Sequence, residues 1–205
     1  MSMEEILGRL FRKQVDRLIA AGFPGTIHLD DDGFRERLEP LNGCLAKAAE
    51  HVRGNHQRFP FIIMPGWYVS PTIHMALIHR KNGAGGIGYH IGGLQDREGN
   101  GNPNPYLLVD VEPGREMDGM APEESGKRFR EAGRLPLSLP EGIVLAILHP
   151  EQLDEGAIDC FGSTCGPFQI PSIGIRREQP FLLCSDVRIQ LIGHGAASCA
   201  ARIGI

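Results

Sequence analysis

This sequence has no long hydrophobic run, no excess of basic residues and few aromatic side chains. No apolar stretch among the 205 residues approaches the roughly 20 residues that cross a bilayer, so we expect no membrane segment. The net charge is -4 and the basic residues are scattered, which is not typical of a protein that binds nucleic acid. Internal repeats and recognisable linkers are also absent, so we expect a single domain.

A secretory signal is likewise not evident. The first residues, Met-Ser-Met-Glu-Glu-Ile, carry acidic side chains where such a signal needs basic ones. The chain has five cysteines, an odd number for a framework of disulfides. We therefore expect a cytoplasmic protein with reduced thiols.

Glycine and proline are abundant, with 27 and 15 residues spread through the chain, and they indicate many turns between short strands. Helices are expected where apolar residues recur every three or four positions behind a capping residue. They follow Ser2, the acidic triplet at 30–32, Pro122 and the capping box Ser138-Leu-Pro-Glu141, and Pro40 should interrupt the second. Strands are expected at 59–64, 72–78, 87–91, 106–111, 158–161, 170–175, 181–184 and 188–192.

These elements predict an α+β fold with helices packed on a mixed, mostly antiparallel sheet. Within one domain of residues 1–205, the segments are a helical start at 1–54, strands at 59–111, helices at 121–149 and short strands at 158–205. Tyr106-Leu-Leu-Val-Asp-Val111 is a nearly continuous apolar run, which is typical of a central strand covered on both faces.

Four cysteines near the end of the chain are the main candidates for chemistry: Cys160, Cys165, Cys184 and Cys199. The four residues between Cys160 and Cys165 are compatible with a zinc loop, but the other two cysteines do not form a second close pair. Cys165, in a turn before Gly166, is also a candidate nucleophile, with His149 and His194 the nearest histidines in the sequence. The third interpretation is that all four are buried small apolar residues.

Gly83-Ala-Gly85-Gly-Ile-Gly88 matches the dinucleotide-binding pattern Gly-x-Gly-x-x-Gly. That pattern binds a cofactor only where its last glycine opens a helix, and the following Tyr-His-Ile-Gly-Gly does not suit a helix. We therefore predict a hairpin turn and no dinucleotide.

Residues that would contact a ligand are chosen by type and position. Paired aromatic side chains on a loop, Trp67 and Tyr68, would form a ligand wall or a partner patch, or would fold back over the core. His90 lies on an expected strand, where histidine usually has a structural role, and we keep it as a binding candidate. The basic cluster around Lys127 and Arg128 has a simpler explanation, because basic residues complement the end of a helix.

The second half of the chain resembles an uncharacterised family of bacterial proteins of about 200 residues, a domain of unknown function, over residues 105–205. The matching positions are 106–111, Gly114, Glu116, Pro122, Glu124, Gly133, Arg134, Pro136, Leu137, 141–143, His149, Pro150, Cys160, Ser163, Cys165, Gly166, Pro171, Cys184, Ser198, Cys199 and Arg202. The resemblance implies that Arg134, Glu141 and the cysteine loop belong to a recurring pattern, and it implies no activity. Family members carry tryptophans and a histidine soon after the position of Cys184, where this chain has Ser185-Asp-Val-Arg-Ile-Gln.

The sequence therefore favours a protein that binds a small molecule or a protein partner, with no assignable reaction. Binding candidates are Trp67, Tyr68, His90, Arg134 and Glu141. The alternative is an enzyme that uses Cys165 as nucleophile, or a zinc protein that uses the four cysteines. Exposed edges of short strands make a homodimer a further expectation.

Overall fold

The computed structural model describes residues 3–53, 58–66, 70–80, 83–88, 93–96 and 103–204. The helices are α1 (Met3–Ala20), α2 (Phe23–Thr26), α3 (Asp31–Leu38), α4 (Leu45–Ala49), α5 (Pro71–Met75), α6 (Pro122–Ala132), α7 (Leu139–Leu148) and α8 (Gln152–Glu155), with 3-10 helices η1 (Glu39–Cys44) and η2 (Arg115–Met117). The strands are β1 (Phe59–Met64), β2 (His79–Arg80), β3 (Gly83–Ala84), β4 (Gly86–Ile87), β5 (Gln95–Asp96), β6 (Tyr106–Val111), β7 (Leu135–Pro136), β8 (Ala157–Asp159), β9 (Ser163–Thr164), β10 (Gln169–Arg176), β11 (Gln179–Asp186), β12 (His194–Ala196), β13 (Ser198–Cys199) and β14 (Ala201–Gly204).

Two sheets organise the fold, and together with the helices they confirm the predicted α+β class. One sheet is antiparallel, with β6 between β1 and β14. The other has the order β12-β8-β10-β11-β4, with parallel pairs at both ends and antiparallel pairs between them. Every residue of β6 is buried, as its apolar sequence predicts for a central strand.

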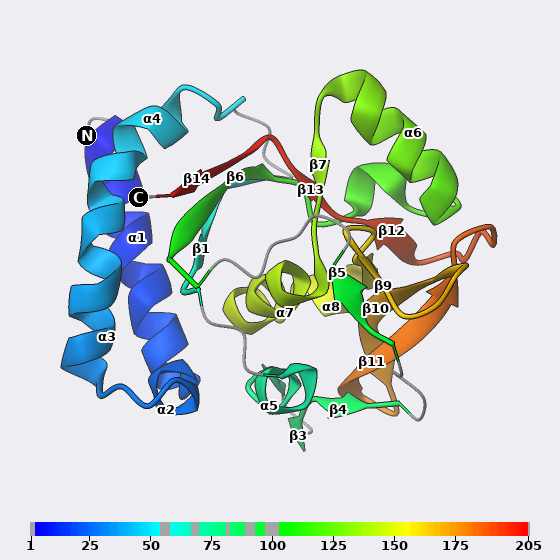
Figure 1. Cartoon of the computed structure of the whole chain (residues 1–205), viewed down its shortest axis with the longest axis horizontal. Helices are drawn as coiled ribbons and strands as arrows, with labels where there is room; N and C mark the ends of the chain where they lie inside the picture. Colours follow the sequence, from blue (N-terminus) through cyan, green and yellow to red (C-terminus); the bar gives the residue numbers. More distant parts are fainter. Residues whose placement is uncertain are drawn as a thin grey trace.

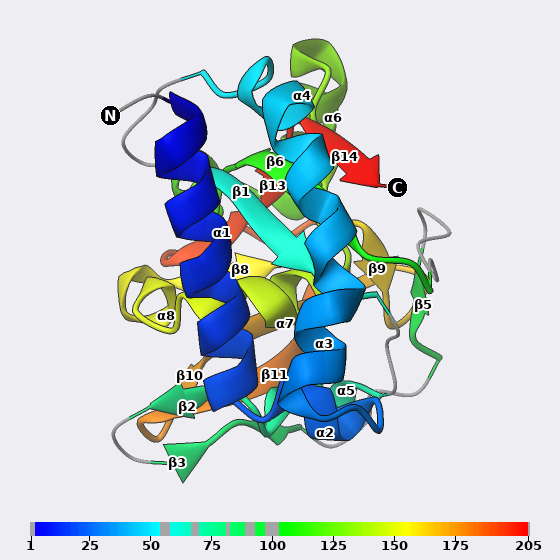
Figure 2. The same ribbon diagram turned by 90° about the vertical axis from the view of Figure 1, so that its left-hand side faces the viewer.

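The first helices form a layer on one side of the molecule. In Figure 2, α1 and α3 run antiparallel beside each other in front of β1. Asp30 caps α3 by accepting a 2.8 Å hydrogen bond from the Gly33 amide, as expected for the acidic triplet. The predicted break at Pro40 is confirmed, because α3 gives way to η1 at this point.

Helix α7 lies in the centre of the fold, where it contacts β1 of the first sheet and β10 of the second (Figure 1). Nine of its residues, from Leu139 to Leu148, are buried. The predicted capping box is present, and Glu141 accepts a 2.7 Å hydrogen bond from the Ser138 amide. A helix that is apolar on nearly all sides, with Glu141 as its one charged residue, is typical of such a position between two layers.

Two of the predicted strands are wrong. Residues 72–78 were expected to form a strand, but 71–75 form helix α5. The Ser70 side chain caps this helix by accepting a hydrogen bond from the Ile73 amide, and Pro71 suits the first helical turn. Residues 188–192 form no strand, and a local turn in which Asp186 accepts from the Arg188 amide takes their place. The expected strand at 87–91 is described only as far as Gly88, with β4 covering Gly86–Ile87.

His74, on α5, should make the stability of the protein depend on pH. Its side chain is 1% exposed and stacks on Phe23 with 4.8 Å between ring centroids. Burial lowers the pKa of His74 to about 4 from 6.5, so the unfolded chain binds the proton more readily. The stabilising effect of the neutral ring should be present above pH 6.5 and disappear toward pH 4, a loss of about 3 kcal/mol in total.

Urea unfolding at about pH 7 and about pH 4.5 measures this loss. His74→Leu should show a smaller decrease between the two pH values than the unmodified protein. His79→Leu, at an exposed position, is the matched control and should keep the full decrease. Equal decreases in all three proteins would show that His74 does not carry the effect.

Candidate functional site

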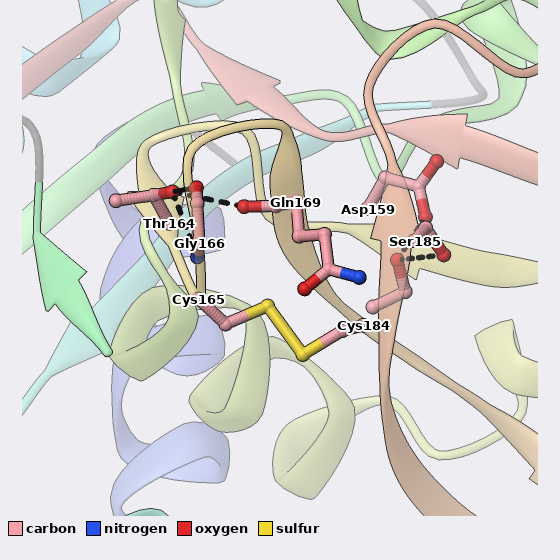
Figure 3. Close-up of a disulfide and its surroundings, with 8 residues drawn as sticks. Asp159, Thr164, Cys165, Gly166, Gln169, Cys184 and Ser185 are labelled. Atoms are coloured by element: carbon pink, nitrogen blue, oxygen red, sulfur yellow. Dashed lines mark hydrogen bonds between the residues drawn. A yellow bond between two sulfur atoms is a disulfide. The ribbon is translucent and has the colours of Figure 1, made fainter. Parts of the chain in front are cut away.

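Two of the four cysteines are joined in the structure. A disulfide links Cys165, in the turn between β9 and β10, to Cys184 on β11, with 6.6 Å between the Cα atoms (Figure 3). The expectation of reduced thiols is therefore not met at this pair. In the disulfide form Cys165 has no thiolate, so the nucleophile interpretation applies only to the reduced protein.

The other two cysteines lie elsewhere in the core. Cys160 and Cys199 lie outside this disulfide and are fully buried, consistent with small apolar residues. Cys199 lies in β13, which pairs with β7 and not with the strands that carry the disulfide. Within the described ranges, no group of three or more His, Cys, Asp or Glu side chains is placed to hold a metal ion. The structure therefore does not assemble the expected zinc ligands from the four cysteines.

The loop candidates Trp67, Tyr68 and His90 lie outside the described residues. The glycine-rich segment is described as far as Gly88. Gly83–Ala84 form β3, which pairs antiparallel with β2 in a hairpin, and Gly86–Ile87 form β4, which pairs parallel with β11, so the glycine pattern lies in strands and not in the predicted hairpin turn. Gly85 is a close-approach position, since a Cβ atom there would lie 2.2 Å from the backbone oxygen of Met75. The pattern thus serves the packing of this hairpin against α5.

Arg134, a binding candidate from the sequence, belongs to a cluster of charged residues beside β6. Asp110 accepts hydrogen bonds of 2.8 Å from both Arg134 Nη1 and Arg58 Nη1. Arg134 also donates to the backbone oxygen of Asp110 and to the side chain and backbone of Ser198. Glu116 binds Arg58 through two contacts of 2.9 and 2.8 Å. Both guanidinium groups are therefore held in fixed positions.

Asp110 has an unusual backbone for a residue within a strand. Its φ angle is 52°, in the left-handed region that residues other than glycine seldom occupy. Its side chain is 2% exposed, so the carboxylate depends on the two arginines for its charge compensation. A conformation of this kind costs about 1–3 kcal/mol and is concentrated at functional sites.

Two further carboxyl groups complete the cluster. The hydrogen bond to Glu116 is the main reason that the pKa of Arg58 is raised, and Asp110 adds to it while burial opposes it. Glu112 accepts from the amides of Gly114 and Glu116, and burial raises its pKa. Its buried Oε2 has no hydrogen-bond partner among the described residues.

A pocket of about 290 Å³ opens beside this cluster. Its lining residues are Glu50, His51, Arg53, Arg58, Ala132, Gly133, Arg134 and Ala200. Ala132 and Gly133 are at the C-terminal end of α6, where backbone carbonyls carry a partial negative charge. The pocket therefore combines guanidinium donors with acceptors from α6 and Glu50.

Glu141, the other candidate from the sequence, has a different environment. It is fully buried on α7 and accepts hydrogen bonds from Arg202, Tyr106 and the Ser138 amide. These contacts connect α7 to β6 and β14. Glu141 does not line the arginine pocket, so the structure separates the two polar candidates that the family resemblance had grouped.

Comparison with known proteins identifies a family whose model matches this chain. Residues 17–175, which are more than half of the chain, match a family of unknown function, DUF5701. The chain belongs to this family. A search of curated proteins and a search of solved structures each found no match. The DUF5701 match agrees with the expected domain of unknown function, and it extends toward the N-terminus as far as the last turn of α1.

The DUF5701 segment includes Arg58, Asp110 and Arg134, whereas Cys184 and Arg202 follow its end. Sequence reasoning missed the partnership of Asp110 with the two arginines. The available signal was a carboxylate inside the apolar run at 106–111, because a buried charge requires a partner. No helix in the described part of the chain combines the length and apolar character needed to span a membrane.

Proposed function

We propose that this protein binds a small polar molecule that bears a carboxylate or phosphate group, in the pocket formed by Arg53, Arg58 and Arg134. The observation that carries the proposal is the strained, buried Asp110, which holds two of these arginines at the pocket wall. Such preorganisation allows a ligand to bind without first ordering long side chains.

The hydrogen bonds of the arginines support an anionic group on the ligand. Arg58 has five N–H groups, and its contacts to Asp110 and Glu116 use three of them. Arg53 is exposed and has no hydrogen-bond or ion-pair partner among the described residues. These free donors match the oxygen atoms of a carboxylate or phosphate.

The remaining wall of the pocket suggests that the same ligand also carries hydrogen-bond donors. Glu50 and the C-terminal end of α6 contribute acceptors to the same lining as the arginines. Amino acids and hydroxy acids combine both kinds of group, and a volume of about 290 Å³ suits molecules of that size. We further propose a bacterial, cytoplasmic protein on the sequence grounds given above, which fractionation of native cells would test.

Isothermal titration with serine, glycolate and inorganic phosphate tests the pocket. At least one of these probes should bind with a Kd near or below about 1 mM. Arg53→Gln should weaken that binding about tenfold or more, since a charge-assisted hydrogen bond contributes about 1.5–3 kcal/mol. Arg53 is exposed and makes no hydrogen bond or ion pair among the described residues, so the free energy of unfolding should remain unchanged.

Arg35→Gln provides the matched control. Arg35 forms an exposed ion pair with Asp16 on the helical layer and does not line the pocket. Its replacement should leave the affinity unchanged. The proposal fails if none of the three probes binds. It also fails if Arg53→Gln, like the control Arg35→Gln, binds its probe as tightly as the unmodified protein does.

A further inference from the structure

A row of polar side chains crosses one face of the five-stranded sheet, and none of its members lines the arginine pocket. It consists of His194 on β12, Asp159 on β8, Ser172 on β10 and Ser185 on β11. Asp159 Oδ1 lies 3.1 Å from His194 Nδ1 and accepts a 2.6 Å hydrogen bond from Ser172. The hydroxyl groups of Ser172 and Ser185 are 2.8 Å apart, and Asp159 and Ser185 both appear in Figure 3.

The strand register explains why these side chains share a face. Asp159 is paired with Ser172 on one side and with Ala196 on the other. Side chains alternate along a strand, so His194 lies on the same face as Ala196. The opposite face carries Ile158 and Ile173, which are fully buried in the apolar core.

The contact with Asp159 determines how the imidazole of His194 is used. A carboxylate accepts only, so Nδ1 carries the proton and Nε2 of the neutral ring has a free lone pair. Asp159 is 2% exposed and fixed by Ser172, while the His194 side chain is 20% exposed. No hydrogen bond to Nε2 of His194 is present among the described residues. Such an imidazole is oriented to accept a proton.

The chain just before His194 forms an apolar surface. Ile189, Leu191 and Ile192 are 52%, 37% and 98% exposed. The His194 amide donates to the Leu191 carbonyl, and the Gly193 amide donates to Asp118, so the backbone of this turn is fixed directly before His194. Exposed aliphatic side chains of this kind suit an uncharged, apolar ligand.

We propose that His194 is a general base that hydrolyses small apolar esters, with Asp159 as its positioning residue and the turn at 189–192 as the substrate surface. Nε2 removes a proton from a water molecule as the water oxygen attacks the ester carbonyl carbon. The carbon–oxygen bond to the alcohol then breaks, and the departing oxygen takes the proton from Nε2. The products are one carboxylic acid and one alcohol, and no redox partner is needed.

Hydrolysis of 4-nitrophenyl butyrate tests the proposal, with 4-nitrophenyl phosphate as the charged comparison. The butyrate ester should be hydrolysed and the phosphate should not. His194→Gln should lower kcat/KM about a hundredfold, the usual contribution of a general base. Ile192→Ser should raise KM with little change in kcat, because Ile192 would contribute only to substrate binding. His79→Gln, at an exposed histidine outside the row, should leave both constants unchanged.

The role of Asp159 is tested by measuring which nitrogen of the His194 imidazole carries the proton. In nuclear magnetic resonance spectra, the Nδ1 proton of His194 should be observable in the unmodified protein and lost in Asp159→Asn. Diethyl pyrocarbonate should modify His194 faster than His149, whose Nε2 is buried. The proposal is overturned if the butyrate ester is not hydrolysed above the level of His194→Gln, or if His194 reacts no faster than His149. A proton at Nε2 in place of Nδ1 would overturn it as well.

Discussion

Replacement of Glu141 by alanine should lower the free energy of unfolding by about 3–5 kcal/mol. The carboxylate is fully buried on α7 and accepts from Arg202 Nε at 2.7 Å and Nη2 at 2.9 Å. It also accepts from the hydroxyl group of Tyr106 at 2.9 Å and from the Ser138 amide at 2.7 Å. Alanine would remove the carboxylate that neutralises the Arg202 charge, in a site with little access to water.

The pKa values of the neighbouring groups agree with this coupling. Burial, followed by the charge of Glu141, raises the pKa of Tyr106. Burial acts to lower the pKa of Arg202, but the hydrogen bond and charge of Glu141 outweigh it and raise that pKa. Both groups therefore keep their protons throughout the neutral range while Glu141 is present.

Urea unfolding of Glu141→Ala measures the loss, and Glu131→Ala is the matched control on the exposed side of α6. The control should change the free energy of unfolding by no more than about 0.5 kcal/mol. In the double variant Glu141→Ala/Arg202→Ala, the second substitution should cost less than it does alone, because the pair is coupled. A loss below about 1 kcal/mol for Glu141→Ala would show that this network does not hold α7 in place.

Reduction of the disulfide between Cys165 and Cys184 should lower the free energy of unfolding by about 3 kcal/mol. The two cysteines are 19 residues apart, and closing a loop of that length restricts the unfolded chain. Unfolding in the presence and absence of dithiothreitol measures the effect. Cys165→Ser should reproduce it without a reductant.

Cys44→Ser is the control for the disulfide, because Cys44 is a free, partly exposed cysteine. Its replacement should leave the free energy of unfolding and the response to dithiothreitol unchanged. If dithiothreitol has no effect on the unmodified protein, the two thiols are not joined in solution. The proposed cytoplasmic location makes this result informative, since disulfides there are usually transient.

Local signals in the sequence determined much of the secondary structure. The capping box at Ser138, the cap at Asp30, the break at Pro40 and the apolar strand at 106–111 were all found where the residues predict them. Each depends on residues close together in the chain, so a single sequence contains the necessary information. The strand predictions at 72–78 and 188–192 were wrong for a related reason. Apolar and β-branched residues favoured a strand, but Ser70 and Asp186 formed local hydrogen bonds instead.

The candidate sites depended on tertiary structure. Asp110 is 52 residues from Arg58 and 24 residues from Arg134 in the sequence, and His194 is 35 residues from Asp159. The sequence by itself determined the α+β class, the starts of the four longest helices and the presence of a carboxylate within β6. Only the packing of β6 against the arginines, and of β12 beside β8, decided which charges meet. Contacts between distant residues are selected by the whole fold, because burying a charge is favourable only where its partner is also present.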